Sequence, residues 1–403
     1  MTTEQKELIL ATAPVLREHG VLLTTHFYKR MFEHNPELKN IFNMGNQQSG
    51  KQQTALANAV LAYAENIANP SVLMPVIDDI GHKHASLDIR PEHYIIVGNH
   101  LISSIQEVLG EAATPAIIDA WTTAYNQLAK IMSGHEAGLY EAQTLKKHGW
   151  TGWRLFKIVR KEMESAEICS FYLYPADGGN VPLHKPGQYI SIKLLLPELK
   201  MNQIRQYSIS SAPSEAYYRI SVKRETDSTL DINGMISNQL HNEIKVDSFV
   251  ELSAPAGNFV LPDNVDSPVM FISGGVGITP FISMIEHLKQ QGARIPITWL
   301  HGCRNESVHA FRKQLEVIFG NNNNLQMYTF YDQCTEENKK DTIYEGYLDM
   351  NRIDSLKHKP GTNYFICGPS FFIRKQFNDL KKLGIDRKNI FFEEFGPQLL
   401  HLN

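Results

Sequence analysis

The stretch VMFISGGVGITP at residues 269–280 decides the fold of the C-terminal part of the chain. Residues 269–273 form an apolar run of the length of a buried strand, and glycines then break it. Thr279 can cap a following helix, and Pro280 can occupy its first turn. This order predicts a loop whose backbone a pyrophosphate can approach at the positive end of a helix. The spacing is not GxGxxG, so the usual dinucleotide fingerprint does not apply.

Around this loop, strand-like and helix-like segments alternate over residues 263–403. The expected strands are 269–273, 297–301, 325–331, 364–367 and 390–392. The expected helices are 279–289, 309–319 and 371–383. This alternation predicts an α/β domain with a parallel sheet that is covered on both faces.

Two further regions precede this domain. Residues 153–262 contain short strand-like runs between Pro and Gly turns, which predicts an antiparallel β-barrel. Residues 1–140 read as consecutive helices, and residues 141–152 as a linker. The chain is therefore predicted to be multidomain. The expected barrel strands are 168–173, 189–194, 207–210 and 217–222, and the prolines at expected helix breaks or first turns are Pro14, Pro36, Pro70 and Pro91.

Composition argues against several classes of protein. The chain has 39 Lys and Arg and 43 Asp and Glu residues, so its formal net charge is −4, and it lacks the overall positive charge that favours nucleic-acid binding. No apolar run approaches the ~20 residues of a membrane-spanning helix, and the polar N-terminus lacks the layout of a signal peptide. The cysteines form no CxxC pair, zinc pattern or CxxCH motif, so a reducing cytoplasm is expected. The four cysteines are Cys169, Cys303, Cys334 and Cys367.

The helical region places single polar side chains on apolar stripes. His84 continues the stripe of Leu73, Ile77 and Ile80, and Gln52 and Glu136 extend two other stripes. A lone histidine in such a place is more often a hydrogen-bonded core residue than a metal ligand. Several buried polar groups together would have to serve one another or a ligand. Scattered, partly exposed positions are the alternative.

The motifs HFYKRMF (26–32), NPELKNIFNM (35–44) and KHASLDIRPEHY (83–94) resemble the globin domain of bacterial flavohaemoglobins, and the similarity continues through the whole chain. The resemblance implies that His84 is the proximal iron ligand of haem b. It also implies that Tyr28 hydrogen-bonds bound oxygen, with Gln52 near the distal side. Phe42 would pack against the haem, and Leu56 would line the distal pocket.

Tyr94 and Glu136 resemble the proximal pair of that family. A carboxylate near the imidazole N–H would increase electron donation to iron, which favours oxygen activation over reversible storage. Lys83 matches a family position at the haem–flavin junction, although an ordinary solvated lysine explains it equally well.

The barrel region carries the tetrapeptide RQYS at 205–208, which resembles the RxYS motif of ferredoxin–NADP reductase-like flavoproteins. In a strand, Arg205 and Tyr207 share one face, so a pyrophosphate partner lies beside a ring that can pack on the flavin. The resemblance implies that Ser208 hydrogen-bonds flavin N5 and that Gln206 belongs to the same FAD site. Ordinary strand alternation is the alternative.

Neighbouring motifs support the flavin interpretation. Tyr189 of KPGQY (185–189) matches a family flavin contact, and APAGNF (254–259) completes the family pattern. Gly234 and Ser237 lie at an expected helix start that can bind phosphate. The loop at 226–233 departs from the family because it is more polar and apparently longer, which leaves its conformation open.

The nucleotide region carries two more family motifs. ICGP (366–369) ends a strand and would put Cys367 and Gly368 near the nicotinamide, although a buried structural thiol is the alternative for Cys367. EEFGP (393–397) resembles the terminal segment, in which Phe395 would cover the flavin and Glu393 lie near the electron path. Arg304 could meet a 2′-phosphate, or it could be an ordinary solvated arginine. The expected NAD(P) contacts also include Gly274, Gly275, Val276, Gly277, Thr279 and Pro280.

The resemblance implies a nitric oxide dioxygenase with haem b, FAD and NAD(P)H, whose gas partners are oxygen and nitric oxide. NAD(P)H would reduce FAD, FAD would reduce the haem, and oxygen at the haem would oxidise nitric oxide to nitrate. The expected protein is a cytoplasmic monomer, and lipid in the distal haem pocket is a further possibility within the family. An oxygen sensor or store with an attached haem reductase, and a general flavin or quinone reductase, remain the rival functions.

Overall fold

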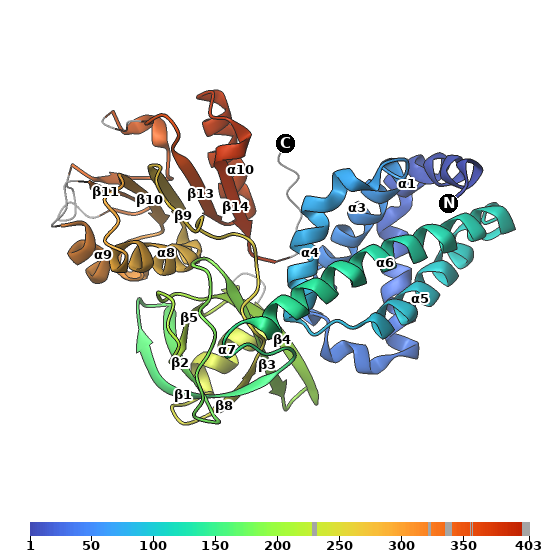
Figure 1. Cartoon of the computed structure of the whole chain (residues 1–403), viewed down its shortest axis with the longest axis horizontal. Coiled ribbons are helices and arrows are strands. Elements are labelled where there is room, and N and C mark those ends of the chain that lie inside the picture. Colours follow the sequence, from blue (N-terminus) through green and yellow to red (C-terminus); the bar gives the residue numbers. More distant parts are fainter. Residues whose placement is uncertain (228–231, 321–323, 335–340, 355, 357, 397–403) are drawn as a thin grey trace. The chain divides into compact units, whose positions relative to one another are not determined.

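The computed structural model describes residues 1–227, 232–320, 324–334, 341–354, 356 and 358–396 (Figure 1). The chain groups into two compact units, each rich in internal contacts. The first unit comprises Met1–Arg154, Ser191–Gln206 and Glu251–Asn258, and the second comprises Leu155–Ile190, Tyr207–Val250 and Phe259–Asn403.

The N-terminal region is helical, as predicted. Its α-helices are α1 (Thr3–His34), α2 (Met44–Gln48), α3 (Lys51–Glu65), α4 (Met74–Ser86), α5 (Pro91–Leu109) and α6 (Pro115–Leu145). Thr2 caps α1 through a reciprocal pair of bonds with Gln5, and Pro91 begins α5 at a position where its missing N–H is not needed. The expected break at Pro14 is wrong, because α1 continues through it.

An antiparallel sheet follows, again as predicted. Its six strands lie in the order β4-β3-β8-β1-β2-β5. An isolated antiparallel bridge joins Ile209, just after β4, to Ile220 in β5, so the two edge strands of the sheet approach each other as in a barrel. The strands are β1 (Arg154–Met163), β2 (Ile168–Pro175), β3 (Tyr189–Leu196), β4 (Met201–Ser208), β5 (Tyr218–Lys223) and β8 (Phe249–Leu252). They are accompanied by α7 (Met235–Asn242) and the pair β6 (Thr226–Asp227) and β7 (Ile232–Asn233).

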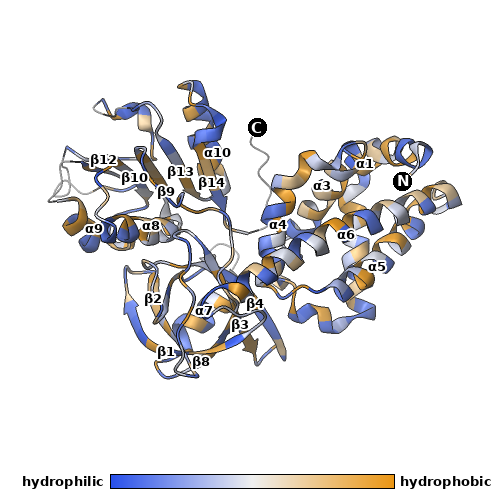
Figure 2. Ribbon diagram, in the orientation of Figure 1, coloured by the Kyte–Doolittle hydropathy of each residue, from blue (hydrophilic) through white to orange (hydrophobic). Residues whose placement is uncertain are grey.

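The C-terminal region is a parallel sheet in the order β12-β11-β10-β9-β13-β14. One apolar core packs the sheet against α8 and α9, and a second packs its opposite face against α10. Figure 2 shows the strands of this sheet as mostly hydrophobic. The strands are β9 (Val269–Gly274), β10 (Ile297–Cys303), β11 (Leu325–Tyr331), β12 (Ile343–Glu345), β13 (Asn363–Gly368) and β14 (Ile390–Glu394). The helices are α8 (Thr279–Gln290), α9 (Arg312–Phe319) and α10 (Ser370–Lys382).

Element boundaries differ from the predictions at two informative places. β4 begins at Met201 rather than at Tyr207, because its polar residue Gln203 is buried and hydrogen-bonded. α9 begins at Arg312 rather than at His309, because Phe311 before it has φ 60°. The domain boundaries at 141–152 and 262–263 stay predictions.

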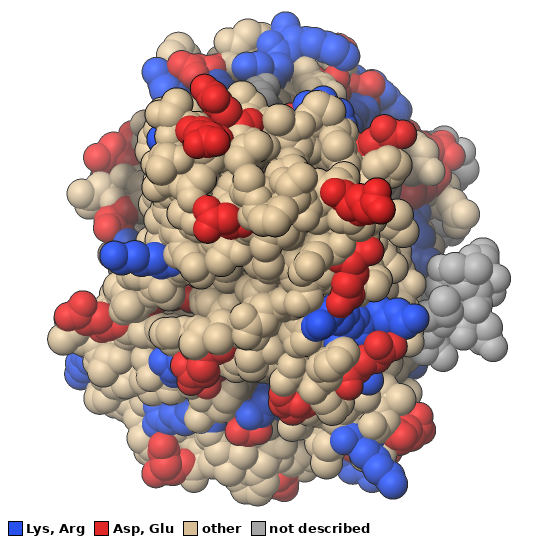
Figure 3. Space-filling view, turned by 90° about the vertical axis from the view of Figure 1, so that its right-hand side faces the viewer, with Lys and Arg blue, Asp and Glu red and all other residues tan. Residues whose placement is uncertain are grey.

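No described helix is long and apolar enough to cross a membrane. On the face drawn in Figure 3, Lys and Arg side chains are interspersed with Asp and Glu.

Candidate functional site

His84 lies near the end of α4 in a small polar cluster. Its Nδ1 is 2.7 Å from Glu136 Oε1 of α6 and 3.0 Å from the Tyr94 hydroxyl of α5. Tyr94 also donates to Glu136 Oε1 over 2.5 Å. Glu136 is 2% exposed, and burial together with that carboxylate raises the pKa of Tyr94, so its hydroxyl stays protonated. Two predicted residues, Glu136 and Tyr94, therefore converge on one imidazole nitrogen of the third, His84.

This arrangement fits a haem ligand. Among the described residues, every bond of the His84 side chain runs through Nδ1, which leaves Nε2 for an iron atom. A carboxylate partner at Nδ1 fixes the tautomer with its lone pair on Nε2 and raises its basicity. The side chain of His84 is 30% exposed, whereas the carboxylate that holds it is buried.

Tyr28 of α1 belongs to the second predicted site of the helical region, the distal pocket. It is 4% exposed, and its ring meets that of Phe42 edge-on, with 5.8 Å between centroids. Burial raises the pKa of Tyr28, while hydrogen bonding with Gln52 and Gln47 opposes the rise. The structure thus brings Tyr28, Phe42 and Gln52 together as expected, and Leu56 packs against the same core. Gln47 was missed, because it lies on the five-residue helix α2, which is too short for a recognisable stripe.

A hydrogen-bond chain joins the helix of His84 to strand β4. Gln206 Nε2 donates to Ser191 Oγ over 3.1 Å, and Ser191 Oγ donates to Ser86 Oγ over 2.9 Å. Ser86 in turn donates to the Lys83 carbonyl over 2.8 Å. The predicted flavin residue Gln206 is thereby connected to the backbone beside His84.

The other residues of the flavin motif follow along β4. Arg205, Gln206 and Tyr207 are all half-buried, and Ser208 is buried, so burial does not alternate along this stretch. Arg205 Nη1 donates to its neighbour's carbonyl at Ile204 over 2.7 Å. Tyr189 is half-buried at the start of β3. All four residues of RQYS thus lie within β4, and their roles toward a flavin stay predictions.

Gly234 caps α7, and Ser237 lies in its first turn. A side chain at Gly234 would come within 2.8 Å of Glu225 Cβ, so close packing explains this glycine. Ser237 Oγ accepts a bond from the Glu225 amide over 3.2 Å, which gives it a local structural role. Residues 228–231 of the unusual loop at 226–233 lie outside the described residues.

The two nucleotide motifs meet at the carboxyl ends of adjacent strands. β9 and β13 are parallel, with Ser273 opposite Cys367. A Cβ at Gly277 would lie 2.3 Å from the Cys367 carbonyl oxygen, and one at Gly368 would lie 2.8 Å from the Phe372 ring. Gly275 has φ 54°, a conformation that favours glycine. The glycines therefore serve the close approach of the loop to the next strand.

The predicted cap at Thr279 is wrong. Ile278 occupies the N-cap position of α8, and Thr279 is already helical. The Thr279 hydroxyl donates to the Val276 carbonyl over 3.0 Å, so it stabilises the preceding turn. Pro280 does lie in the first turn.

Cys367 is fully buried. Its burial, and to a smaller extent the negative charge of Glu393, raise the pKa of the Cys367 thiol. Cys367 and Glu393 are paired in register between β13 and β14. Phe395 is 44% exposed just beyond β14, and Pro397 of the same motif lies outside the described residues. Arg304 forms an ion pair with Glu167, so it has a partner within the protein.

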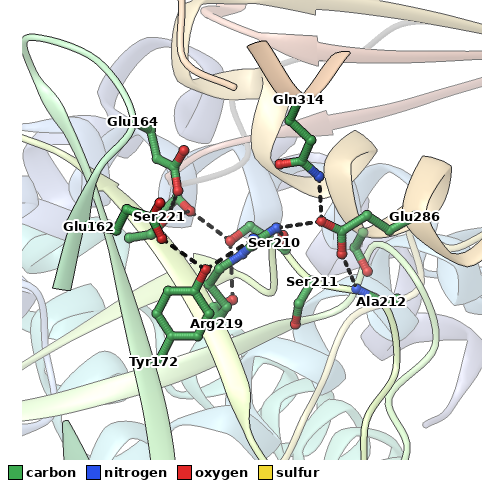
Figure 4. A network of polar contacts seen from close by, with 12 residues as sticks. Glu162, Glu164, Tyr172, Ser210, Ser211, Ala212, Arg219, Ser221, Glu286 and Gln314 are labelled. Atoms are coloured by element: carbon green, nitrogen blue, oxygen red, sulfur yellow. Dashed lines mark hydrogen bonds and ion pairs between the residues drawn. The ribbon is translucent and has the colours of Figure 1, made fainter. Parts of the chain in front are cut away.

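A buried network that the sequence did not reveal ties α8 to the antiparallel sheet (Figure 4). Glu286 of α8 pairs with Arg219 of β5 over 2.9 Å and accepts from the Ala212 amide over 2.7 Å. Gln314 of α9 donates to the same carboxylate over 2.6 Å. Arg219 Nε also donates to the Ser210 carbonyl over 2.9 Å. The helix that follows the glycine loop is therefore fixed to β5 by charge-assisted bonds.

Family comparisons match three parts of the chain. Residues 25–132 match the globin family, residues 156–261 match an oxidoreductase FAD-binding domain, and residues 271–376 match an oxidoreductase NAD-binding domain. Each match falls on the region whose fold it describes: the helices, the antiparallel sheet and the parallel sheet.

Whole-chain relatives agree. The chain is 48% identical to a flavohemoprotein of Bordetella parapertussis and 47% identical to one of Rhizobium meliloti, over 98% and 99% of both partners. A crystal structure of flavohemoglobin from Malassezia yamatoensis with bound FAD and heme is 28% identical. It superposes with a TM-score of 0.86 over 98% of this chain and 99% of that chain. The chain therefore belongs to the flavohemoprotein family, whose globin, FAD-binding and NAD-binding domains it carries.

Proposed function

We propose that the chain is an NAD(P)H-dependent nitric oxide dioxygenase. Electrons would pass from NAD(P)H through FAD to haem b, and oxygen and nitric oxide would react there to give nitrate. The observation that carries the proposal is the 2.7 Å contact between His84 Nδ1 and the buried carboxylate of Glu136. A carboxylate at this nitrogen makes the imidazole a strong electron donor, as oxygen activation requires and simple storage does not.

When bound, haem supplies the iron at which the gases react, and FAD supplies the conversion of a hydride into single electrons. His84 would bind the iron through Nε2, and Glu136 would accept a hydrogen bond from its Nδ1–H group. Tyr94 would hold Glu136 in place. On the distal side, the Tyr28 hydroxyl would donate a hydrogen bond to oxygen, with Gln52 beside it. Phe42 would pack against the haem, and Leu56 would line the distal pocket.

The flavin and nucleotide roles rest on the motif residues. Arg205 would pair with the FAD pyrophosphate, Tyr207 and Tyr189 would pack on the flavin, and Ser208 would hydrogen-bond its N5. The remaining proposed FAD residues are Gln206, Gly234, Ser237 and Phe395. The proposed NAD(P) residues are Gly274, Gly275, Val276, Gly277, Thr279, Pro280, Cys367 and Gly368, and Lys83 and Glu393 are assigned to the electron path.

A solved relative supports the assignment of the reaction. The flavohem-like FAD/NAD-binding domain of nitric oxide dioxygenase from Vibrio cholerae O1 biovar El Tor is 34% identical. It has a TM-score of 0.55 and covers 60% of this chain and 99% of that one. The monomeric state, the three domain boundaries and a cytoplasmic location, which the scattered cysteines favour, remain part of the proposal.

The test compares His84→Ala with His82→Ala, a matched control two residues earlier on α4 whose side chain lies near Asp78. We expect the holoprotein and the control to consume nitric oxide aerobically with NAD(P)H and to form nitrate. His84→Ala should lose this turnover yet keep flavin reduction. Oxygen binding without rapid nitric oxide-triggered NADH oxidation would instead indicate a sensor or store. Unchanged turnover in His84→Ala would exclude His84 as the ligand.

A further inference from the structure

Three potential metal ligands converge at the carboxyl end of β10, outside the sites described above. His301 and Cys303 are two residues apart on β10, so their side chains share one face of that strand. His309 follows the short helix at 306–308. One ligand atom from each residue lies within 4.8 Å of the other two. The three residues are only 1%, 9% and 4% exposed, respectively. One thiol and two imidazoles, which are common ligands of zinc, thus lie close together and buried.

The hydrogen bonds of the two imidazoles leave their Nε2 atoms for a ligand. His301 Nδ1 is 2.8 Å from Ser273 Oγ, which also accepts from Trp299 Nε1 over 2.9 Å. His309 Nδ1 is 2.9 Å from the Tyr331 hydroxyl. Oxygen partners at Nδ1 are the usual second set of contacts around metal-bound histidines.

His309 supplies an independent sign of a missing partner. Its Nε2 is buried and has no hydrogen-bond partner among the described residues. Leaving such a nitrogen unsatisfied costs roughly 1–3 kcal/mol. The contact of the His309 ring with the His301 ring, at 4.5 Å between centroids and 30° between planes, does not satisfy this nitrogen. A cation bound by this nitrogen would remove that cost.

The protonation states suit metal binding. Burial lowers the pKa of His309 to about 4 and that of His301 well below its usual value, so both imidazoles are neutral at neutral pH. Burial, with a smaller contribution from Asp332, raises the pKa of Cys303 to about 12. The thiol is therefore protonated until a cation displaces its proton.

We propose that His301 Nε2, His309 Nε2 and Cys303 Sγ bind one borderline divalent cation of the zinc class. The Cys303 S–H bond would break, a sulfur–metal bond would form, and one proton would leave to solvent. Three protein ligands would leave a fourth tetrahedral position for water. Zinc bonds of about 2.0–2.3 Å place ligand atoms roughly 3.5 Å apart, so ligand atoms that lie up to 4.8 Å apart would move closer on binding.

The cation would lie beside the nucleotide loop. His301 is opposite Ser273 in the register of β9 and β10, and Ser273 directly precedes Gly274. The site is separate from His84, which belongs to the other compact unit of the chain.

The test uses the full-length holoprotein, stripped of loosely bound metal with a chelator and then mixed with Zn²⁺. After gel filtration, elemental analysis should find about one retained zinc per chain besides the haem iron. Mixing in weak buffer should release about one proton per zinc. Cys303→Ser should weaken retention at least tenfold, whereas the control Cys334→Ser should bind as the parent does.

Thermal unfolding separates lost binding from lost folding. Zn²⁺ should raise the Tm of the parent and of Cys334→Ser, because a ligand of the native state stabilises it. Cys303→Ser should keep its flavin and haem absorption, but its Tm should not respond to Zn²⁺. Equal retention by the parent and Cys303→Ser, or no retention by the parent, would overturn the proposal.

Discussion

Glu136 and Glu286 are two largely buried carboxylates with different partners. Glu286 faces a guanidinium, a backbone amide and a glutamine, so its charge is matched by a permanent positive charge. Glu136 faces an imidazole and a phenol, neither of which carries a permanent charge. A carboxylate with a fixed counter-ion fastens elements together, whereas one that faces an imidazole can act on whatever that imidazole binds.

Removing the Glu286 carboxylate should have the largest effect on stability. Glu286→Ala leaves Arg219 buried without its counter-ion, and we expect a loss of about 3–5 kcal/mol in the free energy of unfolding. The lower end is expected, because the Glu286 side chain is 20% exposed. Urea unfolding followed by circular dichroism measures the loss. Gln314→Ala, which removes only one neutral donor, should cost about 1 kcal/mol, and an equal cost for both would contradict the ion-pair interpretation.

The pH of such measurements matters, because His309 is buried in its neutral form. Its pKa is about 4 in the folded chain and near 6.5 unfolded, so the unfolded state binds more protons between these values. The stability from this residue is present above pH 6.5 and is lost as the pH falls. We expect about 2 kcal/mol of loss between pH 7 and pH 5 from His309 alone. His309→Gln should show a shallower pH dependence in urea titrations without added metal, and an unchanged slope would refute the assignment.

Glu136→Gln tests whether Glu136, unlike Glu286, has a role in the reaction. The amide can still meet His84, but without the negative charge the imidazole donates less to iron. We expect nitric oxide turnover to fall by about 10–100-fold and the haem reduction potential to rise. Flavin reduction by NAD(P)H should be unchanged. If the variant kept the haem reduction potential and the nitric oxide turnover of the parent, Glu136 would have only a structural role, as Glu286 has.

Tyr94→Phe should have the smallest effect. It removes one donor from Glu136 but keeps the contact between Glu136 and His84. We expect a loss of about 1 kcal/mol in stability and only a several-fold change in turnover. Stopped-flow haem reduction and urea unfolding measure the two effects. A loss as large as that in Glu136→Gln would mean that Tyr94, rather than Glu136, controls the imidazole.

The sequence predicted the elements with simple periodicity. The apolar run of β9 and the stripes that lead to His84 and Glu136 depend on spacing within one element, which a sequence displays directly. Gln203 was not recognised within β4, because a polar residue becomes a strand residue only when distant partners bind it. The Arg219–Glu286 pair was missed for the same reason.

The cluster of His301, Cys303 and His309 shows another limit. Its ligands follow the spacing HxCx5H, which is not a common zinc pattern, so counting cysteines alone excluded a metal site. Strand alternation brings the first two together, but only the turn before α9 returns His309 to them. Likewise, Thr279 has the composition of a helix cap, yet the turn that precedes it already supplies the helical geometry.

The contacts of Gln203 and Asn258 with the helical region have a mechanical consequence. Gln203 binds backbone groups at Lys39 and Met44, and Asn258 binds Asp78 and Asp79 on the helix of His84. Water can replace amide and carboxylate partners of this kind at little cost. Parting of these contacts would therefore leave no donor or acceptor unsatisfied, because water can bind the freed amide, carbonyl and carboxylate groups.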